Sequence, residues 1–145
     1  AHLRGRVEPT ILTPHEGELS RLLERDSEEI REHRLAAALE AAEAAGATVV
    51  LKGDDTIVTD GARTAVNALP APALATAGSG DVLSGVIAAL LARGMEPFTA
   101  VCAAVLAHAR AGRDAAVRVG APESVIATDV IDSVPLGLRP DGPVE

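Results

Sequence analysis

The pattern of apolar and polar positions along the chain predicts an α/β fold. Residues 47–52 are rich in β-branched side chains and almost continuously apolar, which is typical of a strand buried on both faces. Before them, apolar residues recur at helical spacing over about 27–45, and Gly46 stands where a helix commonly ends. A helix that leads through a glycine into a buried strand is half of a βαβ unit. We therefore expect a sheet covered by helices.

Residues that start or stop regular structure suggest the bounds of the other elements. Asp26 and Glu29 have the spacing of a capping box in front of the helix over 27–45. Thr128 is expected to cap the last helix, which Pro135 should end. The other predicted elements are strands at 10–13, 56–60 and 64–67, a turn at 53–55, and helices over about 16–23, 81–93 and 97–119. Together they make one domain over 1–145, or a piece of a larger one, with 1–9 and 139–145 expected to be poorly ordered.

Composition and charge exclude several classes of function. The chain has 145 residues, a net charge of −8, one Phe and no Trp or Tyr. Nucleic-acid binders usually carry a basic surface and often stack bases on aromatic rings, so nucleic acid is not an expected partner. The longest apolar run, 86–92, is far too short to span a bilayer. The single cysteine, Cys102, cannot form an intrachain disulfide, which fits a reducing, cytoplasmic compartment.

The strongest candidate motif is Gly78-Ser79-Gly80-Asp81, which stands directly before a strongly apolar helix. Glycines let the backbone turn sharply, and the unpaired N–H groups of a first helical turn suit a phosphate. A carboxylate repels a ground-state phosphate, so its presence is explained if Asp81 is a general base that accepts the proton of an attacking hydroxyl. The alternative is that Asp81 simply caps the helix.

Lys52 is the only lysine among 13 basic residues, and it ends the predicted buried strand. Ligands of open α/β sheets bind beyond the carboxyl ends of such strands. Lys52 and the residues that follow it, Gly53, Asp54, Asp55 and Thr56, are therefore candidate ligand contacts. The alternative is a surface lysine at a strand end that binds nothing.

His15 follows another predicted strand, in the segment Thr13-Pro14-His15-Glu16-Gly17-Glu18. It is either a ligand contact or a turn histidine. In the second case Glu16 and Glu18 are acids that the helix dipole favours in a first turn. The other histidines lack metal-ligand spacing to one another or to the cysteine, so no zinc site is expected and no residue is assigned as a metal ligand.

Three segments, in this order, resemble the ribokinase-like superfamily and, more closely, its ADP- or ATP-dependent NAD(P)H-hydrate dehydratase family. They are LTPHEGELSRLL, VVLKG and LATAGSGDVLSGVIAALLARGMEP, and the resemblance covers about 12–115. Thiamine-pathway members of the superfamily typically carry Cys in place of Asp81, and sugar kinases rarely have the first segment. The resemblance implies a three-layer α/β/α fold.

The resemblance also implies a repair reaction, in which NADH or NADPH hydrated at the nicotinamide C6 (NADHX or NADPHX) is dehydrated at the expense of ADP or ATP, with Mg²⁺ accompanying the nucleotide. The C6 hydroxyl would be phosphorylated and then lost as phosphate, a better leaving group than hydroxide. Asp81 would contact the substrate as the base on that hydroxyl. The phosphoryl group would be held by Gly78, Ser79 and Gly80. The adenine nucleotide would contact Lys52, Gly53, Asp54, Asp55, Thr56 and Gly80. His15 would contact the hydrated dinucleotide.

Members of this family are about twice as long, so the chain resembles the C-terminal part of the fold. We expect a partner, either another copy of the chain or a chain that supplies the N-terminal half. Leu69-Pro70 stands where the family usually has a Thr-Gly turn, so this loop's contact with the substrate differs. Two other functions fit the residues: a ribokinase-like small-molecule kinase of another specificity, and a nucleotide-binding domain without activity.

Overall fold

The computed structural model describes residue 3 and residues 6–139, which form two compact units. We call 1–68 together with 96–102 the sheet unit, and 69–95 together with 103–145 the helical unit. Residues 1, 2, 4, 5 and 140–145 belong to the segments expected to be poorly ordered, and they lie outside the described residues. A sheet and helices are both present, which confirms the predicted α/β class.

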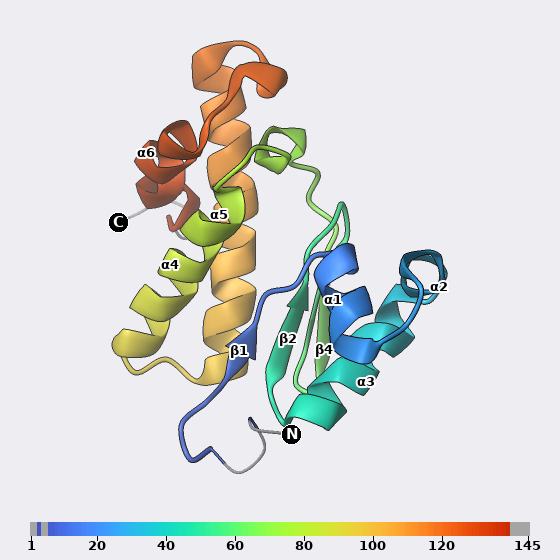
Figure 1. The fold of residues 1–145 in the computed structure, drawn as a ribbon. Helices are drawn as coiled ribbons and strands as arrows, with labels where there is room; N and C mark the ends of the chain where they lie inside the picture. The colour runs from blue at the N-terminus through green and yellow to red at the C-terminus, as the bar shows by residue number, and fades with distance from the viewer. Residues whose placement is uncertain (1–2, 4–5, 140–145) are drawn as a thin grey trace. The chain divides into compact units, whose positions relative to one another are not determined.

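The sheet has four strands in the order β1-β2-β3-β4. Their bounds are Ile11–Leu12 (β1), Thr48–Leu51 (β2), Thr56–Thr59 (β3) and Thr64–Asn67 (β4). β1 is parallel to β2, whereas β3 is antiparallel to both of its neighbours (Figure 1). Every residue of β2 is buried, which confirms the prediction for 47–52, and the predicted hairpin of β3 and β4 is confirmed as well.

Three helices complete the sheet unit: α1 (Glu16–Leu23), α2 (Ser27–Glu32) and α3 (Arg34–Ala45). α3 packs against β2 and β3, and α1 and α2 pack against α3 (Figure 1). Four alanines of α3 are buried in the same core as Leu19, Ile30 and the inner residues of β2 and β3. α1 has the predicted bounds, and Gly46 ends α3 with a left-handed φ of 61° as expected.

The prediction of one helix over 27–45 is wrong, because the chain breaks at His33 with φ −126° and ψ 41°. A straight helix of that length would run about 28 Å, whereas a four-residue strand spans about 13 Å. Its first turns would therefore have no sheet to cover. The break places Ile30 in the core, where it is fully buried. Only half of the capping box forms: Asp26 accepts from the Glu28 N–H at 2.8 Å, but Glu29 pairs with Arg25 instead.

The helical unit contains α4 (Ser79–Ala92), most of α5 (Pro97–Val119), α6 (Ala127–Gly137) and two short 3₁₀ turns, η1 (Pro72–Leu74) and η2 (Pro122–Ser124). α5 has the predicted bounds. α4 starts two residues earlier than predicted, because Gly78 adopts φ 85° and ends the preceding loop there. A core of small and branched residues holds these elements together: Ala73, Ala111, Ala115, Val125 and Val130.

The prediction for the last helix is wrong at both ends. Ile126, not Thr128, is the capping position, and the Asp129 carboxylate accepts a hydrogen bond from the Ile126 N–H at 2.9 Å. The helix also continues through Pro135 to Gly137. Gly137 packs directly on α5, where a side chain would not fit, since an added Cβ would lie 2.2 Å from the Ala107 carbonyl oxygen.

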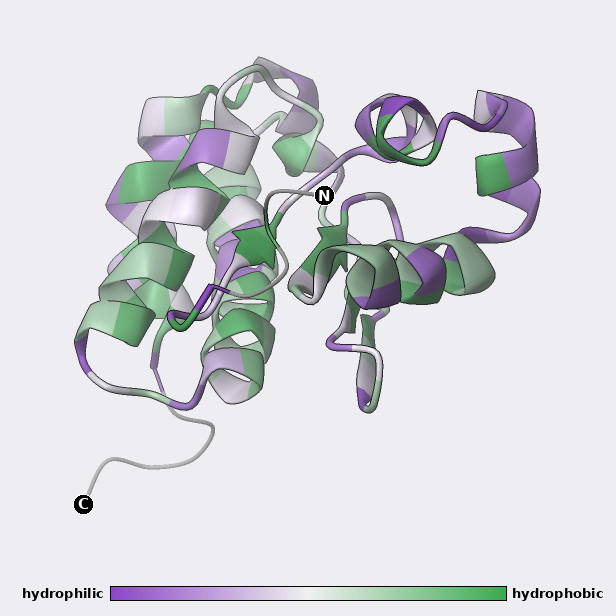
Figure 2. Cartoon of the chain, turned by 60° about the horizontal axis from the view of Figure 1, so that its bottom comes forward, coloured by the Kyte–Doolittle hydropathy of each residue, from purple (hydrophilic) through white to green (hydrophobic). Residues whose placement is uncertain are grey.

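The α1–α2 segment and α4 differ in hydropathy (Figure 2). The α1–α2 segment is mostly hydrophilic and exposes most of its residues, whereas α4 is dominated by Val, Leu, Ile and Ala. Among the described residues, none of the helices combines the length and the apolar character that crossing a membrane requires.

Candidate active site

His15 is the N-terminal cap of α1. Its Nδ1 accepts hydrogen bonds from the N–H groups of Gly17 at 3.0 Å and Glu18 at 3.3 Å, and the Glu18 carboxylate accepts one from the His15 N–H at 2.8 Å. This last bond is the main cause of the lowered pKa of Glu18. Because an accepting Nδ1 carries no proton, the neutral ring has its proton on Nε2. His15 is therefore a turn histidine that still offers one N–H to a ligand.

Lys52 follows β2 directly, and the structure places it beside the segment that carries His15. The Lys52 N–H donates to the Pro14 carbonyl at 2.9 Å, and Nζ lies 3.7 Å from a carboxylate oxygen of Glu18. The Lys52 side chain is 28% exposed, so its ammonium group is held near the surface and remains within reach of a ligand. Lys52 and His15, two of the predicted contact residues, thus belong to neighbouring segments within the sheet unit.

The turn between β2 and β3 comprises Gly53, Asp54 and Asp55, which are all exposed, and Thr56 is the first residue of β3. The Thr56 hydroxyl donates to the Gly53 carbonyl at 3.1 Å and closes the turn. The sequence did not single out Arg34, whose guanidinium donates to the Asp55 carbonyl at 3.1 Å. Arg34 is one of 12 arginines, and no local pattern distinguishes it from the others, because its contact with the turn spans 21 positions of the chain.

The other predicted residues, 78–81, belong to the helical unit. Gly78 needs its left-handed φ of 85°, and its carbonyl accepts from the N–H groups of Asp81 at 3.1 Å and Val82 at 3.2 Å. The Ser79 hydroxyl donates to the Leu74 carbonyl at 2.6 Å and is buried, and the Ser79 N–H donates to the Thr76 carbonyl at 3.3 Å, so both donors of Ser79 are already paired. Among the described residues no backbone acceptor pairs with the Gly80 N–H, as is usual for the second residue of a helix.

Asp81 is the third residue of α4, and it is exposed. The alternative that it caps the helix is wrong, because the capping position is Gly78 and the cap makes no side-chain hydrogen bond. The carboxylate is favoured there by the helix dipole. It stands in the same helical turn as the Gly80 N–H. This arrangement can combine a proton acceptor with an anion-binding amide.

His108 on α5 is a second feature that the sequence did not reveal. It is 6% exposed, and its Nε2 is buried without a hydrogen-bond partner among the described residues. Burial lowers its pKa to about 4, and a hydrogen bond to the backbone of Ser79 opposes that shift. The ring is therefore neutral at pH 7 and supports the start of α4. Only its place in an apolar stretch hinted at burial.

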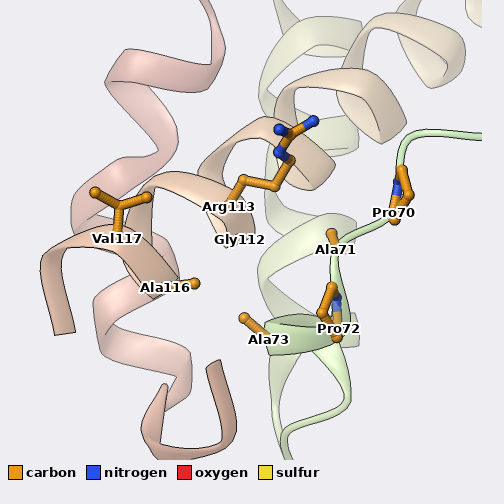
Figure 3. A pocket seen from close by; sticks show the side chains of 8 residues that line it. All are labelled: Pro70, Ala71, Pro72, Ala73, Gly112, Arg113, Ala116 and Val117. Atoms are coloured by element: carbon orange, nitrogen blue, oxygen red, sulfur yellow. The ribbon is translucent and has the colours of Figure 1, made fainter. Parts of the chain in front are cut away.

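An open pocket of about 310 Å³ lies in the helical unit, lined by 70–73 and by Gly112, Arg113, Ala116 and Val117 of α5 (Figure 3). Arg113 is the single charged residue in its lining. Small-molecule pockets start near 300 Å³, so this one has room for a single ring system and not for a whole dinucleotide. Pro70, in the loop where the resemblance led us to expect a difference from the family, forms part of its wall.

Solved structures with the same fold define the class of protein. An ADP/ATP-dependent NAD(P)H-hydrate dehydratase from Bacillus subtilis, co-crystallised with ATP/Mg²⁺ and soaked with CoA, matches with a TM-score of 0.79 and 30% identity, over 93% of this chain and 52% of that one. A ribokinase-like superfamily protein from Enterococcus faecalis matches with a TM-score of 0.75 and 29% identity, over 91% and 45%. The fold is therefore ribokinase-like, as the resemblance implied.

Sequence comparison gives the family within this class. A family model described as NAD(P)H-hydrate dehydratase matches residues 2–136, and this chain belongs to that family. The bifunctional NAD(P)H-hydrate repair enzyme Nnr of Thermofilum pendens is 42% identical over 139 residues, which make up 95% of this chain and 26% of that protein. The chain spans about a quarter of the length of the curated relatives it matches, and about half of the matched dehydratase structure.

Proposed function

We propose that this chain carries residues of a nucleotide-dependent NAD(P)H-hydrate dehydratase, which restores NADH or NADPH from NADHX or NADPHX. Membership of the family and the relatives that share its sequence support this activity. The observation that carries the proposal is the exposed Asp81 carboxylate in the first turn of α4, a helix that begins directly after the left-handed Gly78. A phosphoryl transfer to a hydroxyl needs a proton acceptor beside a group of anion-binding amides.

Phosphorylation solves the chemical difficulty of this dehydration, because hydroxide is a poor leaving group and phosphate a good one. The C6 hydroxyl oxygen forms a bond to the terminal phosphorus of ADP or ATP as the phosphoanhydride bond breaks. Asp81 would accept the hydroxyl proton during this attack. The backbone at Gly78, Ser79 and Gly80 would hold the phosphoryl group, with the Gly80 N–H, which has no backbone acceptor among the described residues, as a donor. The C6–O bond then breaks with loss of phosphate, and a ring proton is released as the double bond forms.

We assign the adenine nucleotide to Lys52, to the turn of Gly53, Asp54 and Asp55 with Thr56, and to Gly80. The Lys52 ammonium supplies positive charge for phosphate oxygens, and the His15 Nε2–H would donate to the hydrated dinucleotide. Nucleotide chemistry of this kind uses Mg²⁺, which neutralises charge on the phosphates. The described residues hold no cluster of three or more His, Cys, Asp or Glu. They fit an ion that is bound largely by phosphates and water, with an exposed carboxylate such as Asp54 as an additional ligand.

Asp81→Asn tests the proposal, because it removes the proton acceptor and keeps the size of the side chain. We expect kcat for the recovery of 340-nm absorbance from NADHX with ATP or ADP to fall about 10²- to 10⁴-fold, the usual contribution of a general base. Nucleotide affinity by calorimetry should be largely unchanged. Asp132→Asn, an exposed aspartate on α6, is the matched control. Wild-type kcat in Asp81→Asn would contradict the assignment of the base.

A panel of other substrates separates the dehydratase activity from the two alternative functions, a small-molecule kinase and a nucleotide-binding domain without activity. Net phosphorylation of a sugar or a pyrimidine alcohol, with no activity on NADHX, would favour a small-molecule kinase. ATP binding without any turnover would favour a binding domain.

We also propose that the chain works in the cytoplasm and with a partner chain. Its single cysteine supports a reducing compartment. β1 has a neighbour on one side alone within the described sheet, and a polypeptide that adds a strand there would continue the sheet. Light scattering distinguishes a second copy, which doubles the mass, from a separate chain. A monomer that is stable and fully active would contradict the partner.

A further inference from the structure

The Arg34 guanidinium occupies the inner side of the turn between β2 and β3. Its Nη2 lies 3.1 Å from the Asp55 carbonyl oxygen, 3.4 Å from that of Lys52 and 3.5 Å from that of Leu51. The side chain is 20% exposed, so water competes little for these contacts. One cation therefore gathers three carbonyl groups that bracket the turn. No other described side chain donates to these three carbonyls.

Arg34 is itself held in place from a second helix. Its Nη1 forms an ion pair with the carboxylate of Glu16, the first residue of α1, and that carboxylate also lies 3.4 Å from Nε of Arg31. Arg34 is the first residue of α3. Arg34 thus belongs to one helix and its guanidinium is held by an acidic side chain of another, so that it supports the turn from both.

Gly53 fits this support because it has no side chain. An added Cβ would lie 2.5 Å from Nη2 and 2.9 Å from Nη1 of Arg34, closer than real Cβ contacts come. The guanidinium therefore fills the space that a side chain at position 53 would need. In addition, the carbonyl of Lys52 points at Arg34, so the Gly53 N–H of the same trans peptide points away from it. Among the described residues no backbone acceptor pairs with this N–H, so it can serve a ligand.

We propose that Arg34 is a positioning residue for nucleotide binding, which holds the turn between β2 and β3 so that the Gly53 N–H faces the phosphates in one fixed arrangement beside Lys52. The inference rests on the proposed function, because the adenine nucleotide is the ligand of the turn. It differs from a purely structural ion pair in one respect. Loss of Arg34 should weaken the binding of nucleotide and leave the hydrated dinucleotide and the chemical step almost unaffected, because Arg34 bonds to the turn and to Glu16 and not to His15 or Asp81.

Arg34→Met is the principal variant, and Arg25→Met is its matched control. Arg25 also pairs with two carboxylates, those of Glu29 and Glu40, and is similarly covered at 27% exposure, but these partners lie on helices away from the turn. We expect Arg34→Met to raise the Kd for ATP·Mg²⁺ by calorimetry, and the KM for ATP, about tenfold or more, with kcat and the KM for NADHX within about threefold. Arg25→Met should change none of them.

Arg34→Lys tests the shape of the contact, because it keeps the charge and loses the planar fork. We expect it to bind ATP·Mg²⁺ nearly as weakly as Arg34→Met. A wild-type Kd in Arg34→Lys would overturn the proposal. Gly53→Ala should weaken nucleotide binding by displacing the guanidinium. Added to Arg34→Met, it should have little further effect, because both changes break the same contact. Fully additive losses would overturn the proposal as well.

A measurement without nucleotide separates this inference from the proposed function. Amide hydrogen exchange over 52–56 should become faster in ligand-free Arg34→Met and remain unchanged in Arg25→Met. Unchanged exchange in Arg34→Met would overturn the positioning role even if the enzyme proved active. A third outcome is that exchange is faster in Arg34→Met but the wild-type chain binds no ATP·Mg²⁺. This outcome would confirm that Arg34 supports the turn and would contradict the assignment of the nucleotide to it.

Discussion

Surface ion pairs gather in the sheet unit, whereas the helical unit buries a titratable side chain, His108. Arg63 donates to Glu96 and to Asp60, at 2.8 Å in each case, and its guanidinium lies 4.4 Å from the Phe98 ring. In the helical unit, the hydroxyls of Ser79 and Ser133 donate to backbone carbonyls within the core. The buried His108 is uncharged at pH 7.

The difference teaches that the two units should fail under different conditions. Exposed ion pairs contribute little each and are screened by salt. Buried neutral groups and close helix contacts tolerate salt, but they cannot accept an added atom or an added charge. A substitution that adds atoms to the core, or mild acid, should therefore destabilise the helical unit first. Strong acid should be needed to break the ion pairs of the sheet unit.

The largest effect should come from Gly137→Ala, which tests whether close packing holds the helical unit. The new Cβ would lie 2.2 Å from the Ala107 carbonyl oxygen, so α6 must move away from α5. We expect unfolding by urea to show a loss of about 3 kcal/mol or more, at the upper end of overpacking. Gly85→Ala on α4 meets nothing within 4 Å and should instead stabilise the chain by about 0.5–1 kcal/mol. Equal effects of the two changes would contradict the role of packing.

Next in size is the effect of mild acid on His108. Its pKa is lowered from 6.5 to about 4 in the folded chain, so between these values the unfolded chain binds the additional proton. Stability should therefore fall as the pH drops from about 6.5 to 4, by about 3 kcal/mol in all, and this group has no effect above that window. His108→Leu should remove this part of the pH dependence in urea unfolding. His33→Gln, a change at an exposed histidine, is the control and should preserve it.

The smallest effect should come from Glu96→Gln, which tests the charged groups of the sheet unit. Bonds from Arg63 and Thr99 lower the pKa of Glu96 from 4.5 to about 2. The stability that Glu96 contributes to the folded chain is therefore fully present above about pH 4.5 and is lost as the pH falls toward 2. Thermal unfolding should show a small decrease in Tm at pH 7 and a weaker pH dependence below 4.5. Glu32→Gln on α2 is the control and should leave the pH dependence as in the wild type. A wild-type pH dependence in Glu96→Gln would contradict the role of the Glu96 bonds to Arg63 and Thr99.

Several elements were predictable because their signals are local. Pro97 stands at the first position of α5, and Gly46 supplies the left-handed residue that ends α3. The break at His33 was not predictable, since the apolar spacing of 27–45 continues through it and only the length of the sheet makes a single helix unfavourable. The cap of α6 was missed because a carboxylate at Asp129 replaces the expected hydroxyl of Thr128.

The sequence by itself determined the strands and most helices, the glycine turn before Asp81, the position of the only lysine at a strand end, and the family. These features depend on neighbouring residues, through backbone conformation and hydrophobic periodicity. The tertiary structure alone decided that His15 uses Nδ1 as a cap, that Arg34 fills the space beside Gly53, and that His108 is buried against the backbone of Ser79. Contacts between residues far apart in the chain, Arg34 with Asp55 or His108 with Ser79, depend on how the elements pack, and local periodicity carries no information about that packing.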